Sequence, residues 1–153
     1  MYTNEDAAVF AGMMGLFFIG LIIIAVLYIF LALGLYKMAV RENINNPWLA
    51  WIPVAQYYTL GELVKHKLGT NAPMILLILG LLNLVLSWIP ILGSVYSIAF
   101  VIFYIIVMHW LFEKYSTNAT IMTVFNAITL SSLSPFFVFA IRNNPNRLEN
   151  TTW

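Results

Sequence analysis

The chain has 153 residues, of which 62% are hydrophobic and only 8% are charged, and its formal net charge is +1. A soluble domain carries about 25% charged residues, so this composition excludes an ordinary water-soluble protein and indicates an integral membrane protein. Its apolar runs are continuous and not alternating, which favours an all-α protein over a β-barrel. The near-neutral charge gives no reason to expect a nucleic-acid partner. The absence of cysteine excludes disulfides, thiol catalysis and thiolate metal sites.

The first residues carry Glu5 and Asp6 but no Lys or Arg, and a long apolar run follows. A cleaved signal peptide begins with positive charge and has a shorter apolar region. We therefore expect the first apolar run to be a membrane span of the protein itself.

Charged residues divide the chain into three long uncharged runs, over residues 7–36, 68–112 and 115–141. A spanning helix needs about 20 mostly apolar residues, and the middle run is long enough for two. Pro90 and Gly93, in the sequence SWIPILGSVYS, predict the turn between those two. We therefore expect four transmembrane helices, over about residues 9–36, 73–89, 95–112 and 120–141, followed by a polar tail over residues 142–153.

The segment 47–65, between the first two expected spans, has a different composition. Pro47 suits the first position of a helix, and Pro53 removes a backbone donor and predicts a kink. Polar residues then recur at every third position: Gln56, Thr59, Glu62 and Lys65. A two-faced helix with Trp and Tyr favours the membrane interface, so we expect a kinked interfacial or re-entrant helix; a fifth span is the alternative. Its candidate functional residues are Trp48, Trp51, Pro53, Gln56, Tyr57, Tyr58 and Glu62.

The basic residues favour the four-span arrangement over the five-span one. Cytoplasmic loops are enriched in Lys and Arg. With four spans, five basic residues lie inside (Lys37, Arg41, Lys65, Lys67 and Lys114), and Arg142 and Arg147 lie outside. With five spans the division is four to three. We therefore expect an external N-terminus and a cytoplasmic segment 47–65.

Four stretches, NPWLAWIPVAQYYTLGELV, WIPILGSVYSI, FEKYS and SPFFVFAIRNNP, resemble a family of small uncharacterised bacterial multi-span membrane proteins. That family has a Trp-x-x-Ile-Pro segment after its first span, and the similarity covers about residues 37–145. The chain departs from the pattern at Gln56, where Asn is common, and at Glu113, where Gly is usual. The resemblance implies a location in the bacterial cytoplasmic membrane.

Few polar side chains lie inside the expected spans. His109 and Glu113 are four residues apart and would share a helix face, which suits a proton relay, half of a metal site, or an interfacial His that ends the span. Asn83 and Asn126 lie in mid-span, where buried amides usually form hydrogen bonds between helices and can also line a solute path. These four residues are the candidate intramembrane polar sites.

The sequence lacks the patterns of enzymes: it has no Ser/His/Asp set, no Gly-rich phosphate loop and no zinc-ligand spacing. We therefore expect a non-enzymatic protein without a cofactor or a metal, surrounded by the lipid bilayer. The leading hypothesis is an accessory, regulatory or immunity-type partner of another membrane component, or of a second copy of itself. The alternative is a small transporter or channel with a path along the third and fourth spans.

Overall fold

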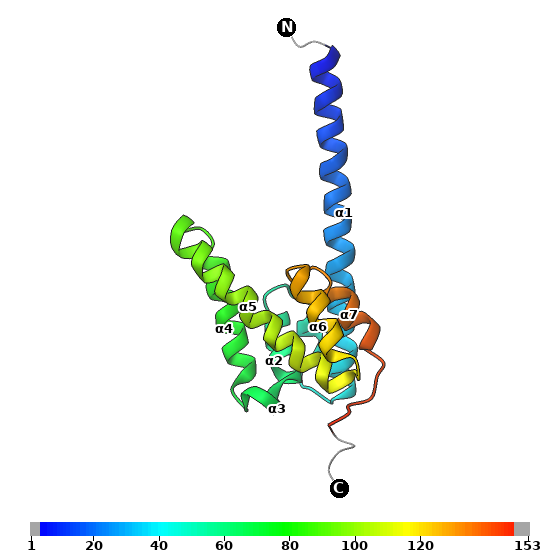
Figure 1. Ribbon diagram of the computed structural model, residues 1–153, viewed down its shortest axis with the longest axis vertical. Coiled ribbons are helices and arrows are strands. Elements are labelled where there is room, and N and C mark those ends of the chain that lie inside the picture. The colour runs from blue at the N-terminus through cyan, green and yellow to red at the C-terminus, as the bar shows by residue number, and fades with distance from the viewer. Residues whose placement is uncertain (1–3, 149–153) are drawn as a thin grey trace.

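The structure, a computed structural model, describes residues 4–148, and within that range every regular element is a helix (Figure 1). In chain order these are α1 (Asn4–Arg41), the 3-10 helix η1 (Pro47–Trp51), α2 (Gln56–Leu63), α3 (Lys65–Leu68), α4 (Ala72–Leu86), α5 (Pro90–Tyr115), α6 (Ala119–Ile128) and α7 (Ser134–Ile141). The all-helical prediction is confirmed. Two helices, α1 and α5, have the length and apolar composition needed to cross a membrane, so the expected count of four is not supported.

Helix α1 is much longer than the rest of the molecule, and its N-terminal half extends away from the other helices (Figure 1). Glu5 and Asp6 lie in its first turn and Arg41 in its last, where each charge complements the helix dipole. The helix ends where Asn43 takes a positive φ of 52°, a conformation that Asn tolerates better than most residues. Only 6% of its most apolar 18-residue stretch is buried.

Helices α4 and α5 form an antiparallel hairpin, as expected, but its turn is shorter than the sequence predicted. Pro90 begins α5 instead of interrupting a helix, because proline suits the first helical position. Gly93 therefore lies inside α5, where an added Cβ would come 2.3 Å from the Leu86 carbonyl oxygen at the end of α4. The helix α5 covers residues 90–115, and the expected span over 95–112 was too short.

The expected fourth span, residues 120–141, is not one helix. Leu130 and Ser131 take positive φ values of 49° and 68°, which ends α6, and Pro135 then lies in the first turn of α7. The chain reverses direction between the two short helices, since the Asn144 side-chain amide, after α7, donates to the Tyr115 carbonyl, before α6, at 2.8 Å. Residues 119–141 therefore start and end at the same end of the molecule, and we call residues 129–133 the hairpin tip.

The segment 42–64 also starts and ends at this end of the molecule. The Tyr28 hydroxyl donates to the Trp51 carbonyl, whereas the Lys114 ammonium donates to the carbonyl of Leu63. About 20 Å of helix separates Tyr28 from Arg41, so η1 lies well inside the molecule and α2 returns beside α1. The segment thus forms a second helical hairpin, and α2 packs between helices instead of lying on a surface.

All seven basic residues lie in α3 or near the C-terminal ends of α1, α5 and α7. Hydrogen bonds join these ends, from Arg41 to Asn144 and from Arg147 to Lys114. We call this part of the molecule the charged end; it is at the bottom of Figure 1. The main buried core fills the same half, mostly with residues of α1, α2, α5 and α7. Helices α1 and α7 run in the same direction, and Gly34 allows them to approach closely, since an added Cβ would lie 2.7 Å from Val138 Cγ1. The fold therefore has a packed, charged half and an open half made of α1 and the α4–α5 hairpin.

Candidate functional site

A group of buried polar side chains lies where the two helical hairpins, residues 42–64 and 119–141, meet α5. The Ser134 hydroxyl, at the start of α7, donates to Asn126 Oδ1 on α6 at 2.8 Å. Ser134 also interacts with the hydroxyl of Tyr104 on α5, and the ring of Tyr104 meets that of Tyr57 edge to face at 6.3 Å. Gln56 precedes Tyr57 at the start of α2. We call these five residues the polar cluster.

The polar cluster is not fully satisfied internally. Within the cluster, Gln56 Nε2 and Asn126 Nδ2 are buried and have no hydrogen-bond partner, and the same holds for the hydroxyl of Ser131 in the hairpin tip. Gln56 and Tyr104 also line a cavity of about 40 Å³ with apolar residues of α1 and α2. A water molecule needs at least about 10–15 Å³ and two or more polar partners, so this cavity has room for water at Gln56. The cluster can bind water or a small neutral hydrogen-bonding group.

The cluster lies away from the charged end, near the end of α6 and the start of α2. Helix α6 has 10 residues, so its end lies about 15 Å from the charged end. None of the cluster's side chains carries a charge at neutral pH. Among the described residues no group of His, Cys, Asp and Glu could hold a metal ion.

His109 and Glu113 each form their shortest side-chain contact with a residue of another element. His109 Nδ1 lies 2.7 Å from the Thr123 hydroxyl and so connects α5 to α6, whereas Glu113 forms an ion pair with Lys67 at 3.0 Å. The shared-face prediction was geometrically reasonable, but each side chain has a partner on a different element. Both interactions hold helices together.

The two predicted mid-span amides have different surroundings. Asn83 Oδ1 accepts a hydrogen bond from the Ser97 hydroxyl at 3.1 Å and so connects α4 to α5. Asn126 belongs to the polar cluster and is fully buried. The amide of Asn83 therefore has a structural contact, whereas that of Asn126 keeps an unused donor.

The aromatic segment divides into an outer and an inner part. Trp48 and Trp51 are 55% and 40% exposed, and Pro53 lies in the exposed turn that separates η1 from α2. Tyr58 is half-buried, and Glu62 forms an ion pair with Lys65 at the charged end. The polar stripe on α2 thus faces two environments: Gln56 and Thr59 are buried in the molecule, and only its last turn is at the surface.

A buried ion pair organises the charged end. Lys114, only 6% exposed, lies 3.0 Å from Glu42, and the Tyr115 hydroxyl donates to the same carboxylate at 2.8 Å. His66, on α3, is near this group. Partial burial, followed by the positive charges of Lys114 and Lys67, lowers the pKa of His66 below its usual value, so we expect it to be neutral at pH 7.

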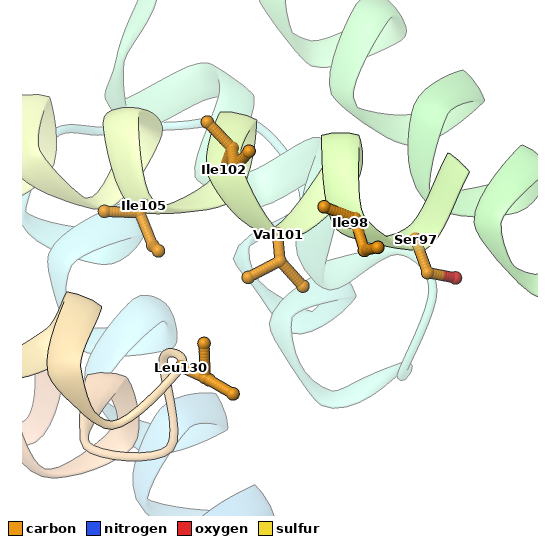
Figure 2. Close-up of a pocket in the computed structure, with 6 residues that line it drawn as sticks. All are labelled: Ser97, Ile98, Val101, Ile102, Ile105 and Leu130. Atoms are coloured by element: carbon orange, nitrogen blue, oxygen red, sulfur yellow. The ribbon is translucent and has the colours of Figure 1, made fainter. Parts of the chain in front are cut away.

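An open apolar groove of about 290 Å³ lies beside the hairpin tip (Figure 2). One face of α5 forms its wall, and Leu130 faces that wall from the tip. The lining residues are Ser97, Ile98, Val101, Ile102, Ile105 and Leu130. Leu130 is 74% exposed, so nothing in the described chain covers the groove.

Sequence reasoning named Gln56, Tyr57 and Asn126 but did not find Tyr104, which connects them. Tyr104 lies in an apolar run with the pattern of a lipid-facing or core helix, and only the position of the two hairpins makes its hydroxyl part of a site. Comparisons of the chain with protein-family models, with curated proteins and with solved structures found no match. The resemblance to the Trp-x-x-Ile-Pro family therefore stays a prediction.

Proposed function

We propose that the chain is a multi-pass protein of the bacterial cytoplasmic membrane, with its charged end in the cytoplasm. The most apolar 18-residue stretch of α1 has a mean hydropathy of 3.1 and is 6% buried, and that of α5 has a mean hydropathy of 2.4 and is 17% buried. The core helices of a soluble protein are mostly buried. The seven basic residues gather at one end, which is the distribution that the positive-inside rule expects. In this arrangement α1, α4 and α5 cross the membrane, and residues 42–64 and 119–141 enter from the cytoplasmic side and return.

Within this membrane arrangement we propose that the protein acts as a non-enzymatic accessory subunit of a larger assembly. One observation carries the proposal: the hairpin tip is uncovered. A depth of about 15 Å would place it near the middle of a hydrocarbon core about 30 Å thick. Leu130 and Ser132 are exposed there, beside the unpaired hydroxyl of Ser131. Irregular backbone at this depth is tolerated only when protein covers it or water surrounds it.

The groove beside the tip suggests how the partner binds. Its wall consists of successive turns of α5, and its lining is apolar except for Ser97. An apolar transmembrane helix of another membrane protein would fill the groove and cover the tip at the same time. A partner helix would also separate the polar atoms of the tip from lipid.

A crosslink from the hairpin tip tests this proposal, because the chain has no cysteine of its own. A thiol-specific photocrosslinker on Leu130→Cys should give a discrete protein adduct in native membranes, and mass spectrometry would identify the partner. The matched control is Ile78→Cys, at a half-exposed position on α4, which should give only lipid adducts. Identical products from both positions, or no protein adduct at position 130, would count against a partner at the groove. An adduct with a second copy would identify self-association.

A path for a small neutral solute is the second candidate, favoured by the unpaired donors of Gln56 and Asn126 near the cavity. Purified protein in liposomes should then pass water or glycerol, and Gln56→Leu should abolish that flux without unfolding the protein. If the cluster has only a packing role, neither form conducts. Gln56→Leu would then be neutral or stabilising, because it removes an unpaired buried donor.

A further inference from the structure

The parallel helices α1 and α7 enclose a second groove, of about 500 Å³, close to the charged end. One wall is formed by residues at helical spacing on α1: Leu33, Tyr36, Lys37 and Val40. The other wall is formed by Phe139 of α7 and by Arg142, which follows that helix. Three of the six are apolar, and two carry positive charge. The groove thus offers an apolar wall and a cationic site together.

Six of the seven basic residues of the charged end fall into two groups. Lys65, Lys67 and Lys114, on the side of α2, α3 and α5, form ion pairs with Glu62, Glu113 and Glu42 at 2.5, 3.0 and 3.0 Å. On the α1–α7 side, within residues 4–148, Lys37, Arg41 and Arg142 have no carboxylate at ion-pair distance. Among these six residues, those without a carboxylate partner all lie on the side that contains the groove.

The guanidinium of Arg142 is held in place. Its central carbon lies 3.5 Å from the centroid of the Phe139 ring, and its Nη1 donates to the Phe139 carbonyl oxygen. Arg41 fixes the backbone next to it by donating to the carbonyl of Asn144 at 2.8 Å. A planar donor group with a fixed position loses less conformational freedom on binding an anion than a mobile lysine does.

We propose that this groove binds one anionic phospholipid of the cytoplasmic leaflet. The lipid phosphate lies at Lys37 and Arg142, and an acyl chain packs along Leu33, Val40 and Phe139. Basic pockets between membrane-embedded helices on the cytoplasmic side are a known mode of headgroup binding. A free phosphate ion would leave the apolar wall bare. The proposal rests on the membrane location and orientation proposed above.

The test measures lipid preference for the full chain in phosphatidylcholine vesicles that contain a trace of spin-labelled phosphatidylglycerol or spin-labelled phosphatidylcholine. The immobilised fraction of each label gives its relative association with the protein. The wild type should prefer phosphatidylglycerol, and Lys37→Gln should lower that preference about fivefold, the effect of one basic residue at an anionic surface. Lys37→Arg should keep the preference, which separates loss of charge from misfolding.

The matched control is Lys67→Gln. It removes the same charge from an exposed side chain at the charged end, but this lysine forms an ion pair with Glu113. It should change the preference less than twofold. Equal losses in Lys37→Gln and Lys67→Gln, or immobilisation of both labels to the same extent in the wild type, would overturn the lipid site and leave the membrane location intact. Immobilisation of neither label would instead overturn the membrane location.

Discussion

At the scale of single residues, the charged end depends on Lys114. Its ammonium reaches Glu42 at 3.0 Å and the Leu63 carbonyl at 3.1 Å, so one side chain of α5 holds both α1 and α2. Tyr115 adds a second hydrogen bond to Glu42. An ion pair buried in this way contributes little by its presence, but removing one partner leaves an uncompensated charge away from water.

We predict that Glu42→Gln costs about 3 kcal/mol of unfolding free energy, because the buried Lys114 loses its counter-charge. The control is Glu113→Gln, which breaks the ion pair between Glu113 and Lys67, whose side chains are 44% and 39% exposed. That change should cost at most about 1 kcal/mol. Denaturant titration in mixed micelles measures both values. Similar losses for the two variants would mean that the Glu42 pair is effectively solvated.

At the scale of elements, the return of α2 along α1 requires a close approach to α4. An added Cβ at Gly61 would lie 2.5 Å from the Cα of Pro73 and 2.7 Å from the Ala72 carbonyl oxygen. These are backbone atoms, which cannot move aside as a flexible side chain can. Glycine at this position therefore allows the re-entrant segment to pack inside the molecule.

We expect Gly61→Ala to lower the unfolding free energy by about 1–3 kcal/mol, the usual range for overpacking. Gly20→Ala, on the uncovered half of α1, has nothing within 4 Å of its added Cβ and should be neutral or slightly stabilising. The same micelle titration compares them. If Gly61→Ala leaves the unfolding free energy unchanged, α2 does not pack against α4 and is instead a surface helix.

The sequence predicted the existence of most elements but not how the chain reverses. Apolar runs and charge placement predicted helices and located the α4–α5 hairpin. The break after α6 depends on positive φ at Leu130 and Ser131, which are not residues that normally signal such a turn. Pro90 was interpreted as part of the turn, yet it lies at a helix start, as Pro135 does in α7. Of the polar cluster, Gln56, Tyr57 and Asn126 were predicted as candidate residues. Their meeting at α5 was not, because it depends on the chain reversals within residues 42–64 and 119–141.

At the scale of the whole molecule, the helical hairpin of α6 and α7 changes the expected topology. A continuous fourth span would put Arg142 and Arg147 on the opposite side from the other five basic residues. The reversal instead brings them back: the Arg147 amide donates to the Lys114 carbonyl at 2.9 Å, and Arg41 donates to the Asn144 carbonyl. All seven basic residues then lie on one side, so the charge pattern and the fold agree without exception.

The most direct test of this topology is labelling of single cysteines by a membrane-impermeant maleimide in intact cells and in inverted vesicles. The positions are Ala7 in the first turns of α1, His66 in α3, and Asn143 just after α7, each exposed. We predict that His66→Cys and Asn143→Cys are labelled only in inverted vesicles, and Ala7→Cys only in intact cells. Labelling of Asn143→Cys in intact cells, with His66→Cys still protected, would contradict the re-entrant hairpin and restore a fourth span.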